Sequence, residues 1–378
     1  MSITRKALHR EIRRSLRNNY GAENFDEYRF GKYPFSKTER KQNFFISKNG
    51  LKRTIKNLFG LNNKKYKVKL DRLIKGYLPQ IDQNLKNLST RDQILYKSLV
   101  IYRLLGFKKV KLPRNNSDYW SAIETAKSLV DNNDTIDPEF LHFVLKKCDL
   151  KPIGYNVQFY FTEKGIAVDY ILEQYAYKVG KEVIVGAQEG DTVLDLGACW
   201  GDTALYFADK VGKKGKVYSF EFIPSSIQIF RQNLEHNPQF RGIVELIEHP
   251  AADKSDEKYF YVENGPGSRV SSQPLPGHTG SLTSISIDDL VEQRKIPKVD
   301  FIKMDIEGAE LLALEGAIVT IKKFRPKLAI AIYHSLEDFV NIPQWILNLD
   351  LGYKIYIDHY SIHAEETVCF ALPRNDIK

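Results

Sequence analysis

The sequence predicts an α/β protein in which a doubly wound, mostly parallel sheet of seven strands follows a mostly α-helical basic domain. Two observations support this fold class. From about residue 157, short apolar runs alternate with segments of helical periodicity, which is the pattern of βαβ units. Before that point, apolar residues recur at spacings of three and four, and Lys and Arg outnumber acidic residues. We place the boundary in the segment 151–156, which predicts domains at 1–155 and 156–378.

The formal net charge of +9 is distributed unevenly along the chain. Residues 1–150 contain 32 Lys and Arg against 15 Asp and Glu, so the remainder is net negative. Regions of opposite charge are most simply two domains with different roles. A basic domain can hold phosphate, an acidic glycan, an anionic lipid or nucleic acid, although it can equally be a solvated surface. Contact with a peripheral membrane or another anionic surface through residues 1–114 is therefore an open alternative.

Helical spacing is clearest in the first domain. A Pro at the first helical position after an Asp cap indicates a helix that begins at Asp137. The segment 30–50 contains Gly, Pro and mixed charge and is predicted to be rich in loops. We therefore expect helices at 91–107, 119–130 and 137–148, and a short amphipathic helix within 1–21.

The second domain shows the expected alternation of strands and helices. Apolar runs predict strands at 191–197, 215–222, 243–249, 298–305, 327–334, 353–358 and 367–373. Helical patterns lie between them at 201–211, 224–237, 308–324 and 339–350. The segment 254–297 interrupts this alternation with several Gly and Pro residues. It is predicted to be a loop-rich insertion, a natural place for a substrate lid.

Several classes of protein are disfavoured by composition. No apolar run reaches the roughly 20 residues that span a bilayer, and the basic N-terminus has no apolar core of a secretory signal. Cys148, Cys199 and Cys369 are far apart, which disfavours a disulfide framework or a structural zinc site. No Walker motif and no nucleophile elbow is present. A cytoplasmic protein is expected.

The strongest motif is the turn Asp195–Asp202 between the first strand and its helix. Its glycines let the backbone turn tightly, and the helix start supplies free N–H groups. An acid precedes the turn, which would repel a phosphate but can hold an ammonium group. S-adenosyl-L-methionine offers an α-amino group and no phosphate, so the turn favours this cofactor over NAD. The predicted contacts are Asp195, Gly197, Ala198, Cys199, Gly201 and Asp202.

The next two strands end in residues suited to the rest of such a cofactor. Glu221 ends the second strand, where a carboxylate can accept hydrogen bonds from both ribose hydroxyls. Phe222 could pack on the adenine face. Ala251 and Ala252 follow the third strand and would leave room for adenine.

Two further polar residues end strands at the edge where ligands bind in such sheets. Asp305 follows the fourth strand and could orient a substrate, hold a metal or close the methionyl end of the pocket. His334 follows the fifth strand and could take a proton from a hydroxyl, although a structural histidine is an equal alternative. Glu307 and Glu310 are explained equally well as acids at a helix N-terminus. No metal site is predicted, although a divalent ion bound at Asp305 is an open alternative.

Four segments together resemble the FkbM family of methyltransferases: DLGACWGDTALYFA, VYSFEFIP, VDFIKMDIEGAELLALEGA and IAIYHSLEDF. The resemblance covers about 165–375 and leaves residues 1–150 without a counterpart. It implies a Rossmann-like class I methyltransferase domain that uses S-adenosyl-L-methionine for O-methylation of a sugar, a glycan or a secondary metabolite. Cys199 stands where the family usually has a small polar residue, and Trp200 is bulkier than the common aliphatic residue.

The mechanism that we infer is in-line methyl transfer, with His334 as the base and Asp305 orienting it or the substrate. One alternative is a nucleic-acid methyltransferase that binds through its basic domain. No N-P-P-Y, D-P-P-Y or Pro-Cys sequence follows the fourth strand to support it. A second alternative is a non-catalytic, cofactor-sensing subunit of a glycan-assembly complex. The presence of Asp195, Glu221 and Asp305 argues against that alternative.

Overall fold

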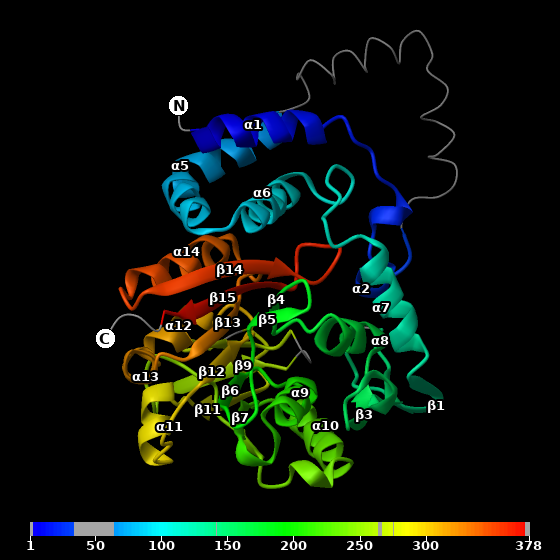
Figure 1. Cartoon of the computed structure of the whole chain (residues 1–378), viewed down its shortest axis with the longest axis vertical. Helices are drawn as coiled ribbons and strands as arrows, with labels where there is room; N and C mark the ends of the chain where they lie inside the picture. The colour runs from blue at the N-terminus through cyan, green and yellow to red at the C-terminus, as the bar shows by residue number, and fades with distance from the viewer. Residues whose placement is uncertain (1–2, 34–63, 141, 264–266, 275, 375–378) are drawn as a thin grey trace. The chain divides into compact units, whose positions relative to one another are not determined.

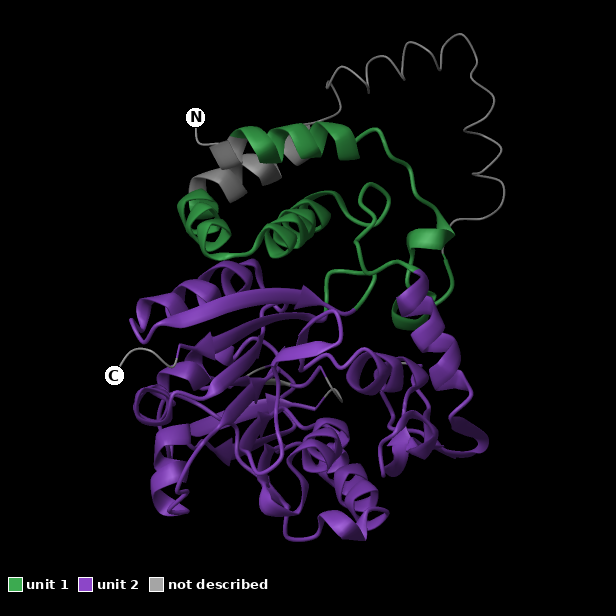
Figure 2. Cartoon of the chain, in the orientation of Figure 1, with its two compact units in different colours: residues 1–116, 361–365 green, residues 117–360, 366–378 purple. Residues whose placement is uncertain are grey.

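The computed structural model describes residues 3–33, 64–140, 142–263, 267–274 and 276–374 (Figure 1). The chain forms two compact units (Figure 2). Unit 1 comprises residues 1–116 with 361–365, and unit 2 comprises 117–360 with 366–378. The units therefore divide at residue 116, earlier in the chain than the predicted boundary at 155. None of the helices in the described ranges is both long enough and apolar enough to cross a bilayer.

Unit 1 is helical, as predicted. Its helices are α1 (Ile3–Ser15), α2 (Glu27–Phe30), α5 (Lys64–Asn87) and α6 (Thr90–Leu105). Helix α6 begins at a Ser89 cap whose hydroxyl accepts a hydrogen bond from the N–H of Asp92, and it ends at Gly106. The helices pack through buried apolar side chains: Leu8, Ile12, Ile81, Leu85, Leu95, Tyr96 and Leu99. Most of the segment 30–50, which we expect to be loop-rich, lies outside the described residues.

Unit 2 begins with α7 (Ser117–Lys127), which confirms the helix predicted there. A small antiparallel sheet follows in the order β1-β2-β3, formed by Val130–Ile136, Leu145–Asp149 and Gln158–Phe161. The helix predicted over 137–148 is therefore wrong. Leu145 and Cys148 are buried, and β2 pairs with strands on both of its sides. These long-range pairings override the local helical pattern.

The main sheet of unit 2 has the predicted seven strands, in the order β14-β15-β13-β12-β6-β7-β8. Their bounds are Thr192–Leu196 (β6), Lys216–Phe220 (β7), Val244–Ile247 (β8), Phe301–Met304 (β12), Lys327–Ala331 (β13), Tyr353–His359 (β14) and Thr367–Pro373 (β15). Strand β15 runs antiparallel to both of its neighbours, whereas the pairs from β13 to β8 are parallel. The strand order reverses at β6, which has β12 on one side and β7 on the other. Ligand sites in such sheets lie beyond the carboxyl ends of the strands at this reversal.

Helices flank this sheet (Figure 1). They are α9 (Asp202–Val211), α10 (Pro224–Glu235), α11 (Ile287–Gln293), α12 (Glu310–Glu315), α13 (Ile318–Phe324) and α14 (Leu336–Asn348). The single helix predicted at 308–324 is divided into α12 and α13. The carboxylate of Asp288 accepts hydrogen bonds from the N–H groups of Val319 and Thr320 and so starts α13 anew. At Gly316, a Cβ would lie 2.0 Å from the carbonyl oxygen of Ala252, so only glycine fits this break.

The insertion at 254–297 contains regular structure that the sequence pattern did not predict. Three strands pair antiparallel in the order β10-β9-β11: Lys258–Val262 (β9), Arg269–Ser271 (β10) and Gly280–Thr283 (β11). Helix α11 then leads back to the main sheet. The prediction of a loop-rich segment is therefore wrong for these strands, because their short runs are separated by the Gly and Pro residues that dominated the pattern.

Candidate functional site

A cavity lies at the carboxyl edge of the main sheet, with about 630 Å³ of empty space that includes space continuous with solvent. The cavity is lined by the last residue of β7, by residues that follow β6, β7, β8 and β12, and by two residues of the insertion: Gly197, Cys199, Phe220, Glu221, Phe222, Ile223, His249, Pro250, Ala251, Ser268, Val270, Asp305, Ile306, Glu307 and Ala309.

The cavity brings together half of the residues that the sequence predicts for the site. Those on its wall are Gly197, Cys199, Glu221, Phe222, Ala251 and Asp305. The remaining predicted residues do not line it: Asp195, Ala198, Gly201, Asp202, Ala252 and His334. The ends of parallel strands form one edge, so strand-end residues could be predicted to meet there, whereas their side-chain directions could not.

Residue 197 must be glycine because the turn passes close to the backbone at the end of β12. Its φ is +84°, and a Cβ there would lie 1.9 Å from the carbonyl oxygen of Asp305. Cys199, two residues later, also has a positive φ of 44°. This conformation is unfavourable for a residue with a side chain, and such strain often marks functional sites.

The carboxylate of Asp195 is buried inside the protein rather than directed to the cavity. It accepts hydrogen bonds from the hydroxyls of Thr203 at 2.9 Å and Ser219 at 3.1 Å. It also forms an ion pair with Lys303, with 3.2 Å between Oδ1 and Nζ. Asp195 therefore holds the turn in shape, and the structure gives it no direct path to the ammonium group that we predicted as its partner.

Lys303 is a functional residue that the sequence analysis missed. Its Nζ donates hydrogen bonds to the carbonyl oxygens of Leu196 at 3.1 Å and Gly197 at 2.7 Å. Burial alone would lower the pKa of Lys303, but Asp195, Asp305 and Asp202 raise it, so the side chain is a cation. The signal was a single lysine in an otherwise apolar strand, FIKM.

Asp202 begins α9 and has a buried Oδ1 atom without a hydrogen-bond partner among the described residues. Burial raises the pKa of Asp202 to about 7, although Lys303 acts to lower it. A buried carboxylate oxygen without a donor is costly unless a ligand supplies one. Partial protonation near neutral pH reduces this cost, and Asp202 does not line the cavity in which a ligand could supply a donor.

The carboxylate of Glu221 is held in place by the backbone that follows it. Its Oε1 accepts hydrogen bonds from the N–H groups of Phe222 at 2.6 Å and Ile223 at 2.8 Å. Glu221 is only 8% exposed, and burial raises its pKa to about 7 against the opposing effect of these hydrogen bonds. A buried carboxylate in a fixed orientation on the cavity wall fits the predicted contact with ribose hydroxyls.

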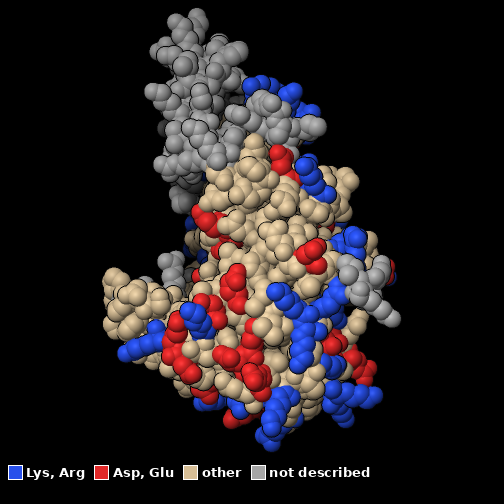
Figure 3. Space-filling view, turned by 90° about the vertical axis from the view of Figure 1, so that its left-hand side faces the viewer, with Lys and Arg blue, Asp and Glu red and all other residues tan. Residues whose placement is uncertain are grey.

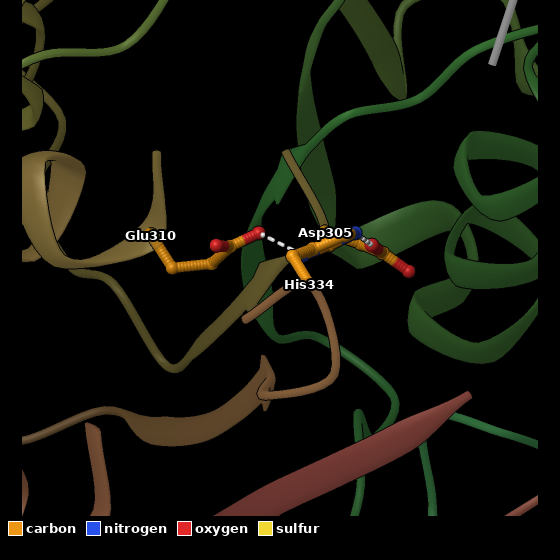
Figure 4. Close-up of side chains that lie close together, drawn as sticks. All are labelled: Asp305, Glu310 and His334. Carbon is orange, nitrogen blue, oxygen red and sulfur yellow. Dashed lines mark ion pairs between the residues drawn. The ribbon is translucent and has the colours of Figure 1, made fainter. Parts of the chain in front are cut away.

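His334 lies between two carboxylates (Figure 4). Its Nε2 is 3.3 Å from Asp305 Oδ1, and its Nδ1 is 3.1 Å from Glu310 Oε1. Neither ring nitrogen meets the geometric criteria of a hydrogen bond. At these distances the two contacts are ion pairs when the imidazole is protonated. Burial would lower the pKa of His334, but the two carboxylates raise it to about 11. The imidazole is therefore doubly protonated at neutral pH.

This charge state argues against the predicted role of His334 as a general base. An imidazolium cannot accept another proton, and His334 does not line the cavity. It instead holds Asp305, which also accepts hydrogen bonds from the hydroxyls of Tyr175 and Tyr333 at 2.9 Å. Burial raises the pKa of Asp305, but His334 and Lys303 lower it below its usual value, so the carboxylate is ionised.

Asp305, Glu310 and His334 offer ligand atoms that lie within 4.8 Å of one another, a grouping that could hold a metal ion. The ring nitrogens of His334, however, are directed to two different carboxylates, as Figure 4 shows. One ion could use only one of these nitrogens. Ion pairing with an imidazolium explains the arrangement without a metal.

The protonation of His334 predicts how its replacement depends on pH. A pKa raised from 6.5 to about 11 stabilises the folded protein fully below pH 6.5, and this contribution is lost as the pH rises toward 11. His334→Gln should therefore lower the free energy of unfolding more at pH 6 than at pH 9. The loss that the substitution causes should decrease by at most about 1.4 kcal/mol for each pH unit. Urea unfolding at the two pH values measures this, and an equal loss at both would mean a neutral imidazole.

Glu307 and His249 also belong to the cavity, although they were not among the predicted site residues. Glu307 has a positive φ of 58°, and 36% of its side chain is exposed. Its Oε1 lies 3.8 Å from Nε2 of His334. His249 contacts the carbonyl oxygen of Thr283 through Nδ1 at 2.9 Å, which makes Nδ1 the donor. This bond ties the insertion to the end of β8.

Comparisons with known proteins agree with the predicted fold class. The family model described as the Methyltransferase FkbM domain matches residues 185–355. The hexuronic acid methyltransferase AglP of Haloferax volcanii is 30% identical over 136 residues, which are 34% of this chain and 51% of that protein. A protein-L-isoaspartate O-methyltransferase of Aeropyrum pernix is 38% identical over 64 residues, 17% of this chain and 24% of that protein. The chain thus spans about half, or less, of the length of these relatives.

Among solved structures, the methyltransferase FkbM from Methylobacillus flagellatus KT is similar with a TM-score of 0.42 and 18% identity. The similarity covers 74% of this chain and 66% of that chain. The fibrillarin of Aeropyrum pernix, solved with S-adenosyl-L-methionine bound, has a TM-score of 0.36 at 17% identity and covers 61% of this chain and 90% of that one.

Proposed function

Residues 185–355 belong to the FkbM methyltransferase family, and from this premise we propose that the protein transfers a methyl group from S-adenosyl-L-methionine to a hydroxyl of a sugar or glycan. The observation that carries the proposal is the cavity at the strand ends, which is lined by the carboxylates of Glu221, Asp305 and Glu307. The first carboxylate suits the cofactor, and the other two suit a hydroxyl acceptor.

The residues present fit the cofactor. Glu221 would hold the ribose hydroxyls, and Phe222, Ile223 and Ala251 would enclose the adenine. The turn at 197–201, of which Gly197 and Cys199 line the cavity, would lie against the methionyl part. The cofactor supplies an already activated methyl group, so the protein mainly has to position the two partners.

At the acceptor end, Asp305 is a fixed anion and Glu307 is a more exposed one. Asp305 is held by His334, Tyr175 and Tyr333, so it is suited to accept a hydrogen bond from an acceptor hydroxyl and orient it. Glu307 lines the same cavity, and its carboxylate would take the hydroxyl proton. Such a proton transfer typically contributes about 10²–10⁴-fold to the rate. His334 then acts through Asp305 as a positioning residue.

A carbohydrate acceptor is supported by the similarity to a hexuronic acid methyltransferase. The lining residues add a restriction, because three of those that the structure describes are acidic and none of them is Lys or Arg. An acidic wall attracts hydroxyl donors and repels carboxylates. We therefore expect the reacting sugar to present a hydroxyl to this wall, with any carboxylate of its own directed away from it.

The test is transfer of a radiolabelled methyl group from S-adenosyl-L-methionine to matched acceptors. We expect label in a glucose- or glucuronate-containing oligosaccharide and none in RNA. Glu307→Gln should lower the turnover number by at least about 100-fold while leaving the affinity for S-adenosylhomocysteine unchanged. Glu292→Gln, an exposed residue of α11, is the matched control. Labelling of RNA alone would contradict the proposal.

A further inference from the structure

The Lys and Arg residues of helix α1 whose side chains the structure describes share one face. Four exposed basic residues of the helix follow the spacing i, i+4, i+7 and i+8, namely Lys6, Arg10, Arg13 and Arg14, and the exposed Arg17 follows in the turn after the helix. At 100° per residue these positions fall within an arc of roughly 100°. The apolar side chains Leu8 and Ile12 point the other way and are buried. We call these five residues the basic face of α1.

The basic face has little compensation from acidic residues. Its one ion pair among the described residues joins Arg10 to Glu11, at 3.9 Å and with Arg10 79% exposed. Like charges four residues apart on a helix repel each other and destabilise it. Figure 3 shows one group of basic side chains beside the grey atoms near the top of the view and further basic groups lower down, where acidic side chains lie among them. An anionic partner would offset this repulsion.

The charge of the whole chain is polarised in the same sense. Residues 1–116 contain 29 Lys and Arg against 8 Asp and Glu, whereas residues 117–378 contain 27 against 39. An anionic surface would therefore attract the first part of the chain and repel the second. Such a distribution favours binding through the first part of the chain.

We propose that the basic face of α1 docks the protein on a bilayer surface rich in anionic lipids. The helical part of the row, from Lys6 to Arg14, extends over about 12 Å, which suits a flat array of charges. It contains no aromatic side chain to stack on bases, which single-stranded nucleic-acid sites generally use. Because Leu8 and Ile12 are engaged in the core, the contact is electrostatic rather than inserted, and salt should reverse it. The proposal does not depend on the methyltransferase reaction.

The experiment is co-sedimentation of the full chain with vesicles of phosphatidylcholine, with or without about one third phosphatidylglycerol, at low and high salt. The variant Arg13→Glu with Arg14→Glu is compared with Lys213→Glu and Lys214→Glu, two exposed lysines of unit 2 that give the same change in net charge. Each basic residue near an anionic surface strengthens binding roughly fivefold. The first pair of substitutions should therefore weaken binding to the anionic vesicles by at least about 30-fold.

Wild type and the Lys213/Lys214 variant should bind the anionic vesicles at low salt and dissociate from them at high salt. Neither protein should bind vesicles of pure phosphatidylcholine. Equal losses in the two variants would show a general effect of net charge and overturn the assignment to α1. Binding of double-stranded DNA or heparin without binding to vesicles would also overturn it, and would assign the basic face to a soluble polyanion. Binding of S-adenosylhomocysteine should be the same in all three proteins, which shows that each is folded.

Discussion

Replacing Glu221 by Gln is expected to weaken the binding of S-adenosylhomocysteine by roughly 100-fold, because hydrogen bonds to a charged group contribute about 1.5–3 kcal/mol each. The amide keeps the size of the side chain and can keep the contact with the N–H groups of Phe222 and Ile223. What it removes is the negative charge that would accept the ribose hydroxyls. Calorimetric titration measures the loss. The exposed substitution Glu292→Gln should leave the affinity unchanged.

The same carboxylate predicts how binding depends on pH. Burial raises the pKa of Glu221 from 4.5 to about 7. Without the cofactor, the side chain in the folded protein is therefore mostly protonated below about pH 7. The stability that this group contributes is therefore lost as the pH rises from 4.5 to about 7. The affinity for S-adenosylhomocysteine should increase from pH 6 to pH 8 as the carboxylate ionises, and this increase should be smaller in Glu221→Gln. An identical pH profile in the two proteins would show that Glu221 does not contact the cofactor.

Replacing Lys303 by Met is expected to lower the free energy of unfolding by about 3–5 kcal/mol, because it leaves the buried carboxylate of Asp195 without its cation. It also removes the donor to the carbonyl oxygens of Leu196 and Gly197, so the turn should lose its shape. Urea unfolding measures the stability. Lys322→Met, on the exposed side of α13, should change it by less than about 0.5 kcal/mol.

A second substitution distinguishes the ion pair from packing. Asp195→Asn in the Lys303→Met background removes the unpaired charge, and it should recover part of the lost stability. The amide of Asn can still bond the hydroxyls of Thr203 and Ser219. If the double variant is less stable than Lys303→Met by the full cost of the Asp195→Asn change alone, the two side chains are not coupled.

The main sheet could be predicted because each of its strands is a short apolar run bounded by polar or helical residues. The strand end predicted at Glu221 and the turn at Gly197 then followed, since parallel strands bring their carboxyl ends to one edge. Strand β2 could not be predicted in this way. Its residues continue a helical pattern from Asp137, and only pairing with β1 and β3 makes it a strand.

The charge states of the site residues could also not be predicted from the sequence. His334 was predicted to be nearly neutral at pH 7, because an isolated histidine side chain is mostly neutral at that pH. The structure places it between Asp305 and Glu310, which come from other parts of the chain, and these carboxylates keep it protonated. The pKa of a buried group depends on its neighbours in space.

The sequence by itself determined which segments form the doubly wound sheet and which residues end its strands, because periodicity and turn residues are local properties of the chain. Tertiary structure alone decided that Asp195 faces Lys303 and that Glu307 reaches the cavity. It also decided that His334 is a cation. Those outcomes depend on side-chain direction and burial, which arise only when distant segments pack together.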